Sequence, residues 1–144
     1  QQEMDMTVKY LAVYIAALVV FLIIDGIWLG LIARSFYVDQ LGHLLRPSPN
    51  FGVAGLFYLF YVVGIVVFAV MPAMAQQSWV TAVILGALLG FIAYGTYDLT
   101  NLATLAGWPV LVSVVDMIWG AVLTATVAAA GYVASRLIFN AGSG

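Results

Sequence analysis

Three aspartates, Asp25, Asp98 and Asp116, lie in stretches of the sequence that are otherwise strongly apolar. An acidic side chain near the centre of a bilayer costs about 2.5–3.5 kcal/mol on insertion scales. Without a basic partner, desolvation and mutual repulsion favour the protonated form of at least one such acid. Carboxyl groups of this kind can carry a proton, bind a cation or hold a polar head group. The three aspartates are therefore the centre of any chemistry we predict.

Asp98 has polar neighbours at helical spacing. Tyr94, Tyr97 and Asn101 would share one stripe of a helix with it. Tyr and Asn side chains carry O–H and N–H donors, which makes them natural partners of a buried carboxyl group. We therefore expect Tyr97 and Asn101 to hydrogen-bond Asp98.

The other two aspartates lie in matching segments, an aliphatic residue followed by Asp-x-Ile-Trp. One segment runs from Asp25 to Trp28 and the other from Asp116 to Trp119. Their helices would run antiparallel, so the match suggests an inverted repeat of the kind that transporters contain. Chance similarity between two apolar helices is the alternative. Trp28 and Trp119 join the predicted site.

The composition indicates which environment holds these residues. The chain has 144 residues, of which 65% are hydrophobic and 7% are charged, whereas soluble domains carry about 25% charged residues. A soluble protein of this size cannot bury so much apolar surface. The excess indicates an integral membrane protein. No basic stripe is present, so no nucleic-acid partner is predicted.

Four stretches are long and apolar enough to span a bilayer, which takes about 20 residues each. They cover residues 8–33, 51–71, 79–105 and 109–139. The second is expected to end at Pro72. Short connections make neighbouring helices antiparallel. We predict an all-α membrane protein, a four-transmembrane-helix bundle forming a single domain over residues 1–144.

The three aspartates lie at one depth in this arrangement. Asp25 comes eight residues before position 33, Asp98 seven before position 105, and Asp116 seven after position 109. These three helix ends lie on the same side of the bilayer. At 1.5 Å per residue, each carboxyl group lies roughly 10–12 Å inside that edge. Three helices thus deliver acids to one level, which is the arrangement of a pocket.

Residues 34–50 join the first two spans on that side and are expected to contain a short amphipathic interfacial helix. Tyr37, Leu41, Leu44 and Leu45 would form its apolar face, and Asp39, His43 and Arg46 its polar face. The segment is either an ordinary connector or a lid over the pocket. In the second case His43 could relay protons toward Asp25 or Asp98, with Arg34 and Arg46 as the nearest cations.

Glycines recur four residues apart at Gly26–Gly30 and at Gly86–Gly90. Small residues at this spacing let helices approach closely in lipid. We expect both pairs to pack within the chain, and homodimerisation is the alternative. Two basic residues lie on each side of the membrane, so the charge distribution predicts no orientation.

The motifs also resemble a known family. The run from Tyr97 to Thr104, Tyr-Asp-Leu-Thr-Asn-Leu-Ala-Thr, together with Gly107-Trp-Pro109 and the two Asp-x-Ile-Trp segments, is similar to the small predicted bacterial integral membrane proteins of the domain-of-unknown-function family 2177. The likeness extends from about residue 8 to residue 136. It implies a multi-pass protein of the bacterial inner (cytoplasmic) membrane and carries no established activity.

Three functions remain open. The first is a small proton-linked transporter or permease of a small or amphiphilic solute. The second is a membrane-embedded lipid-modifying enzyme, or an accessory subunit of one. The third is a structural or assembly subunit in which the acids only specify packing. The expected partners are the bilayer, a lipid or small-molecule ligand and a second copy of the chain. No cofactor is predicted, and no metal site is predicted, because the sequence lacks DxD and HExxH spacings. A hard cation held by the oxygens of the three aspartates and Asn101 is the weaker alternative.

Overall fold

The computed structural model describes residues 5–141, which form helices joined by short connections. The elements in chain order are α1 (Met6–Ile27), the π-helix η1 (Trp28–Ile32), α2 (Arg34–Leu41), α3 (Phe51–Ile65), the π-helix η2 (Val66–Val70), α4 (Met71–Gln76), α5 (Trp79–Thr104) and α6 (Val110–Asn140). Side chains cap three of the long helices: Asp5, Asn50 and Ser78 each accept a hydrogen bond from a backbone N–H in the first turn.

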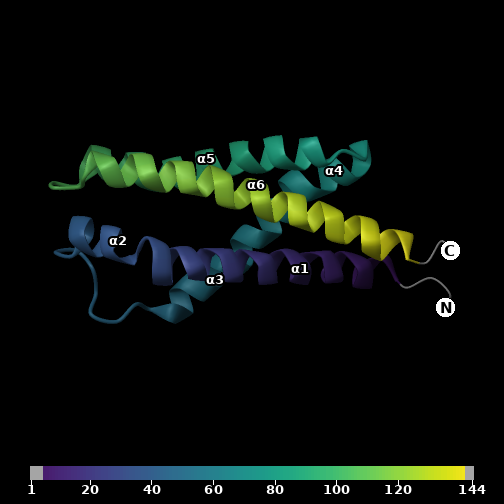
Figure 1. The fold of residues 1–144 in the computed structure, drawn as a ribbon, viewed down its shortest axis with the longest axis horizontal. Helices are drawn as coiled ribbons and strands as arrows, with labels where there is room; N and C mark the ends of the chain where they lie inside the picture. The colour runs from purple at the N-terminus through teal and green to yellow at the C-terminus, as the bar shows by residue number, and fades with distance from the viewer. Residues whose placement is uncertain (1–4, 142–144) are drawn as a thin grey trace.

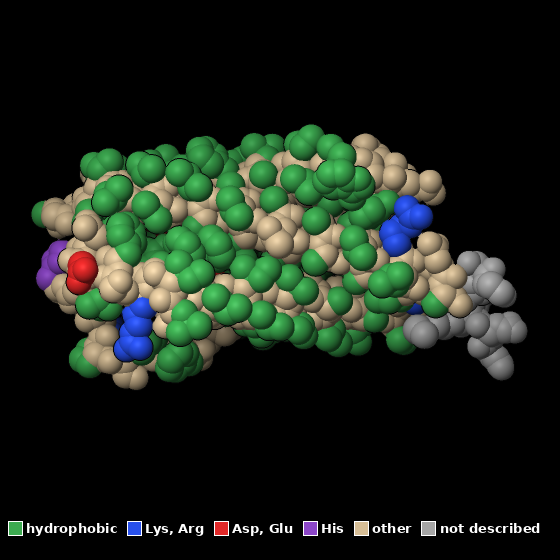
Figure 2. All heavy atoms as spheres, in the orientation of Figure 1, with side chains coloured by type: hydrophobic (Ala, Val, Ile, Leu, Met, Phe, Trp, Pro, Cys, Tyr) green, Lys and Arg blue, Asp and Glu red, His purple; other side chains and the backbone are tan. Residues whose placement is uncertain are grey.

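Four continuous helical stretches are long and apolar enough to cross a membrane: Met6–Ile32, Phe51–Gln76, Trp79–Thr104 and Val110–Asn140. The predicted all-α fold with four spanning helices is confirmed. The start of α1 and the end of α6 lie at one end of the bundle, and α2 lies at the other (Figure 1). The side of the bundle is covered by hydrophobic side chains, while Lys and Arg appear near its two ends (Figure 2). This is the surface that a bilayer requires.

The core lies where α1, α3 and α6 meet. Phe21, Ile65 and Leu123 are fully buried there. A buried hydrogen bond of 2.7 Å between Tyr61 and Thr124 also ties α3 to α6. In lipid the hydrophobic effect does not drive helices together, so packing and polar contacts of this kind hold the bundle.

Glycines set the spacing between α5 and α6. A Cβ atom added to Gly90 would lie 2.1 Å from the Gly120 carbonyl oxygen, and one added to Gly86 would lie 2.8 Å from that of Thr124. The prediction that Gly86 and Gly90 pack within the chain is therefore confirmed. For Gly26 and Gly30 it is wrong, because a Cβ atom at either position would meet no atom within 4 Å.

The second spanning helix continues beyond the predicted end. Pro72 lies in the first turn of α4, and the helix reaches Gln76. A proline inside an α-helix leaves the carbonyl four residues earlier without its donor and clashes with it. Here the π-helix Val66–Val70 comes directly before, and the Met71 N–H bonds to the Val66 carbonyl. The wider turn accommodates the proline, so the expectation of an end at residue 71 is wrong.

The connector between the first two spans contains one short helix, α2. Leu41 on this helix is buried against Trp108 and Val112, which belong to the turn between α5 and α6 and the start of α6. Phe36 and Tyr37 pack against the same cluster. An apolar contact therefore fastens α2 across the α5–α6 end of the bundle. The amphipathic, interfacial character of the whole segment 34–50 remains a prediction.

Candidate functional site

All four long helical segments contribute to a cavity of about 530 Å³. Its lining residues are Asp25, Trp28, Leu29, Ala54, Phe57, Tyr58, Ala93, Tyr94, Thr96, Tyr97, Asp116 and Trp119. Two of the three predicted aspartates and four of the predicted aromatic residues are among them. The cavity has the size and the largely apolar wall of a small-molecule site.

Asp25 forms one polar wall of the cavity. It sits near the end of α1, is 6% exposed, and its Oδ1 accepts a 3.2 Å hydrogen bond from the Trp119 indole N–H. The hydroxyl of Tyr58, on α3, lies close to the same carboxyl group. The Trp119 donor on α6 thus holds the Asp25 side chain, with the Tyr58 hydroxyl of α3 beside it.

Asp116, on α6, is held from a different direction. The Tyr37 hydroxyl donates a 2.9 Å hydrogen bond to Asp116 Oδ1 and accepts one of 3.2 Å from the Trp28 indole N–H. Tyr37 belongs to α2, so the connector between the first two spans supplies the hydrogen-bond donor of the Asp116 carboxyl group. The π-helical turn that begins at Trp28 carries the chain from α1 toward α2. Turns of this type occur frequently at functional sites.

The two Asp-x-Ile-Trp segments exchange their hydrogen bonds. Trp119 follows Asp116 in sequence but donates to Asp25, and Trp28 follows Asp25 but reaches Asp116 through Tyr37. The indole rings stack with centroids 4.2 Å apart and planes 7° apart. This reciprocal arrangement on two antiparallel helices is what a local inverted repeat would produce, and it supports that interpretation.

Asp98 differs from the other two aspartates. Its side chain is fully buried, and neither carboxyl oxygen has a hydrogen-bond partner among residues 5–141. Its carboxyl group is close enough to that of Asp116 to interact with it directly. Two carboxylate anions have no donor to offer each other, whereas a proton on either one turns this contact into a hydrogen bond. The expectation that Tyr97 or Asn101 hydrogen-bonds Asp98 is wrong.

The backbone around Asp98 is held firmly although its side chain is not. The Ser113 hydroxyl donates a 2.9 Å hydrogen bond to the Asp98 carbonyl and accepts one of 3.0 Å from the Trp108 indole N–H. Trp108 also belongs to the apolar cluster with Leu41 and Val112. We call these three residues the end cluster. It lies at the end of the bundle that carries α2, on the same stretch of α5 and α6 as Asp98 and Ser113.

The sequence model of the DUF2177 family, described as a predicted membrane protein, matches residues 10–133. This is most of the chain and includes all three aspartates. The chain belongs to the DUF2177 family. No curated protein and no solved structure matches it. For this DUF2177 protein the site must therefore be interpreted from its own geometry.

The cations predicted near the site lie outside it. Arg34, Arg46 and His43 are exposed and none lines the cavity. The His43 ring lies instead near Gly107, where an added Cβ atom would lie 3.9 Å from Nε2. The α2 segment does touch the site, but through Tyr37. Among the described residues, no three His, Cys, Asp or Glu side chains gather closely enough to hold a metal ion.

The sequence did not identify three aromatic residues of the site in this DUF2177 protein: Tyr37, which donates to Asp116, and Phe57 and Tyr58, which line the cavity. Tyr37 was predicted only as part of an apolar helix face, and Phe57 and Tyr58 were not predicted at all. The second span contains no charged residue, so nothing in its composition marked it as part of a site. Its dense aromatic run, Phe57-Tyr-Leu-Phe-Tyr61, was the available signal.

The Tyr37 hydroxyl is the part of the site that lies outside the spanning helices. Burial, followed by the charge of Asp116, raises the pKa of Tyr37 above its usual value. The side chain therefore keeps its proton at all physiological pH values and remains a donor to Asp116. The Tyr37 hydroxyl is therefore placed to hold the Asp116 carboxyl group.

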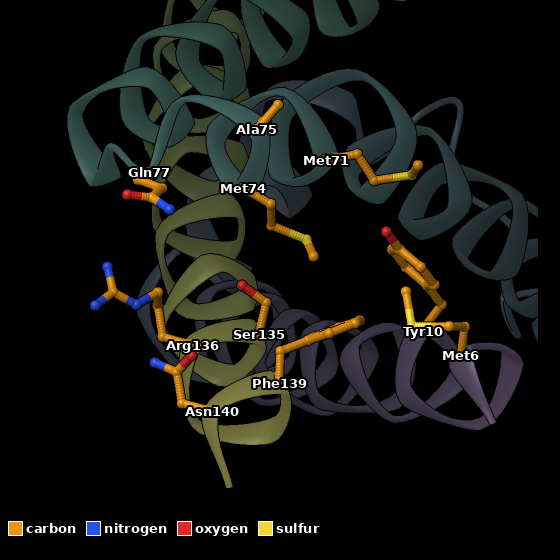
Figure 3. A pocket seen from close by; sticks show the side chains of 10 residues that line it. All are labelled: Met6, Tyr10, Met71, Met74, Ala75, Gln77, Ser135, Arg136, Phe139 and Asn140. Carbon is orange, nitrogen blue, oxygen red and sulfur yellow. The ribbon is translucent and has the colours of Figure 1, made fainter. Parts of the chain in front are cut away.

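A second cavity, of about 560 Å³, lies at the opposite end of the bundle. It is formed by Met6 and Tyr10 of α1, Met71 and Met74 of α4, and residues near the end of α6 (Figure 3). Among the described lining residues, Arg136 is the charged one, and its guanidinium group donates to the Tyr132 hydroxyl at 3.1 Å. None of the described residues of this wall carries a carboxyl group or belongs to the predicted site.

Proposed function

We propose that this protein is a small proton-linked transporter whose central cavity binds a small or amphiphilic solute. The observation that carries the proposal is the state of Asp98, which is fully buried and has two unpartnered carboxyl oxygens beside a second aspartate. Burying an ionised, unpaired carboxylate is very costly, so a proton, a cation or a donor must reach it.

The three aspartates have different parts in this mechanism. Asp25 and Asp116 accept hydrogen bonds from Trp119 and Tyr37, which suits ionised carboxylates facing the cavity. Asp98 lies behind Asp116 and holds the proton that the pair shares. When a positively charged solute enters the cavity, the proton shared by Asp98 and Asp116 can leave to water through the cavity. When the solute leaves, a proton returns to the pair.

The end cluster gives this protein a closed end. Leu41, Trp108 and Val112 pack together on the side of the bundle where α2 crosses the α5–α6 turn. Alternating access requires that Asp98 reach water from each side in turn. Separation of α2 from Trp108 would open that end, and the Tyr37–Asp116 hydrogen bond links this movement to the state of the site.

Proton flux in proteoliposomes tests the proposal. Vesicles containing the protein and a trapped pH-sensitive dye are exposed to a panel of organic cations, amino acids and organic anions. Coupled transport predicts a pH change inside the vesicles with at least one class of solute. Asp98→Asn should abolish this change, whereas Asp39→Asn, the same substitution at an exposed position, should leave it intact. Flux that is equal in wild type and Asp98→Asn would overturn the mechanism.

Infrared spectroscopy of the Asp98–Asp116 pair tests the proposal without any solute. A shared proton produces the infrared carbonyl band of a protonated carboxylic acid at neutral pH. Asp98→Asn should remove that band and Asp39→Asn should retain it. If all carboxyl groups of the wild-type protein are ionised at pH 7, the pair holds no proton and the proposal fails.

A further inference from the structure

We infer that the ligand of the central cavity carries a substituted ammonium group, held between the carboxylates of Asp25 and Asp116 and the surrounding aromatic rings. This inference rests on the proposed function for the route by which the ligand enters and leaves. The binding chemistry itself is argued from the lining residues and can be tested separately.

The charges of the lining are the first argument. Asp25 and Asp116 both face the cavity, and within residues 5–141 no Lys, Arg or His lines it. Each of the two carboxyl groups acts as an acceptor in its hydrogen bond, from Trp119 and from Tyr37. Neither carboxyl group is neutralised by a basic side chain, so complementarity requires positive charge on the ligand.

The aromatic rings are the second argument. Six aromatic side chains line the same cavity: Trp28, Phe57, Tyr58, Tyr94, Tyr97 and Trp119. Ring faces attract organic cations, and desolvated sites of this kind recognise alkylated ammonium groups. A hard metal ion would instead need several oxygen ligands. Among the described residues the acidic and histidine side chains do not gather into such a set.

The rigidity of the wall is the third argument. The stacked pair of Trp28 and Trp119 is fixed at 4.2 Å, with each indole N–H engaged in a hydrogen bond. The two indole donors are therefore already used and are not left for an anion or a carbonyl oxygen. The tyrosine hydroxyls of the wall are neutral, so the charged groups that face a ligand are the two carboxyl groups. The titratable groups that line the cavity are Asp25, Tyr58, Tyr94, Tyr97 and Asp116, and Tyr37 and Asp98 both interact with Asp116.

Calorimetry on the purified full chain in a sugar-based, uncharged detergent tests the ligand class. The probe is benzyl(2-hydroxyethyl)dimethylammonium, and its comparator is the neutral alcohol in which a carbon atom replaces the nitrogen. The two have nearly the same shape, so only the charge differs. The cation should bind at least about tenfold more tightly, as expected for a desolvated cation–aromatic contact reinforced by a carboxylate. Equal binding of the two compounds would overturn the inference.

Variants of the two cavity aspartates test whether the cation binds in this cavity. Asp25→Asn and Asp116→Asn should each weaken binding of the cation while leaving the weak binding of the alcohol unchanged. Asp39→Asn, on the surface, and Arg136→Gln, in the second cavity, should bind both compounds as the wild type does. A cation whose binding is unaffected by both cavity variants is bound elsewhere, and the assignment then fails.

The ammonium group of the ligand can belong to a free amine or to a lipid head group. Added phosphatidylethanolamine should displace the probe if the ammonium group belongs to a lipid, with phosphatidylglycerol as the control that lacks it. No displacement by either lipid identifies a free solute. Both results support the ammonium site. Binding without proton-coupled flux would refute the proposed transport and leave this inference standing.

Discussion

Trp28 and Trp119 stack face to face, and each ring serves the aspartate of the other's segment. Stacked aromatic pairs contribute about 0.5–1.5 kcal/mol beyond the area they bury. The same two rings also orient Asp25 and, through Tyr37, Asp116. The stack therefore joins α1 to α6 and fixes two carboxyl groups at once.

Replacement of Trp119 by Phe tests this cross-pairing. It keeps the apolar bulk but leaves Asp25 without its indole donor, so the unfolding free energy in detergent should fall by about 1 kcal/mol. In the background of Asp25→Asn the same replacement should cost clearly less, because the carboxylate is gone. A double-mutant cycle from thermal or denaturant unfolding measures the difference. If the losses of unfolding free energy in the two single variants add up to the loss in the double variant, Trp119 and Asp25 are not coupled.

Tyr37→Phe removes the link between α2 and Asp116. We expect a loss of about 1 kcal/mol in stability, since one hydroxyl makes both the hydrogen bond to Asp116 and that from Trp28. Substitution of the exposed Tyr97 by Phe is the matched control. A Tyr37→Phe protein with unchanged stability would mean that the hydroxyl contributes nothing to the bundle.

The stability lost in Tyr37→Phe should depend on pH, because the pKa of Tyr37 is raised in the folded protein. A group whose pKa is higher in the folded state gives its full stabilisation below the unfolded pKa, about 10 for tyrosine. That stabilisation disappears only as the pH rises through the higher folded value. The difference in Tm between wild type and Tyr37→Phe should stay constant from pH 7 to about pH 10 and shrink above it. A difference that shrinks below pH 9 would contradict the assignment.

Asp98→Asn should stabilise the protein while it abolishes proton-linked flux. The substitution removes a buried carboxyl group with no partner and supplies an amide that can donate to Asp116. We expect a Tm equal to or above that of wild type, measured in detergent at pH 7. Asp39→Asn should change neither Tm nor flux. Lower stability together with full flux would favour a purely structural role for Asp98.

Two glycine substitutions separate close packing from open surface. Gly90→Ala brings a Cβ atom to 2.1 Å from the Gly120 carbonyl oxygen, so it should cost about 1–3 kcal/mol by forcing α5 away from α6. Gly26→Ala meets nothing within 4 Å and should gain up to about 1 kcal/mol from helix propensity. Thermal unfolding of the two variants measures the contrast. If Gly90→Ala and Gly26→Ala change the stability equally, Gly90 does not set the spacing between α5 and α6.

Leu41→Ala tests the end cluster. Leu41 is 7% exposed and packs against Trp108 and Val112, and its truncation should cost about 2 kcal/mol. It should also raise the passive proton leak of proteoliposomes, because Asp98 loses the cover at that end. Leu44→Ala, at an exposed position of the same connector, is the control. A leak that stays at the wild-type level would show that the cluster does not seal the site.

The sequence alone determined the four spanning helices and predicted a common depth for the three aspartates. Hydropathy and length identify a membrane helix, because lipid leaves no alternative to internal hydrogen bonding. A fixed rise per residue then converts sequence position into depth. Asp25 and Asp116 consequently line one cavity, as their distance from the helix ends predicts. The end of the second span was misplaced because a π-helical turn, which leaves no clear mark in the sequence, accommodates Pro72.

Only the tertiary structure decided which side chains meet. Depth does not specify how far each helix is rotated about its axis, and rotation depends on close contacts such as that of Gly90 with Gly120. The packed bundle therefore pairs Trp119 with Asp25, and it brings Tyr37 of the connector to Asp116. It also places Phe57 and Tyr58 of α3 in the cavity wall. It also leaves Asp98 with no donor, although Tyr97 and Asn101 lie within one turn of it in sequence. A helix fixes which residues are neighbours along its own surface, whereas hydrogen bonds between helices depend on how all of them pack together.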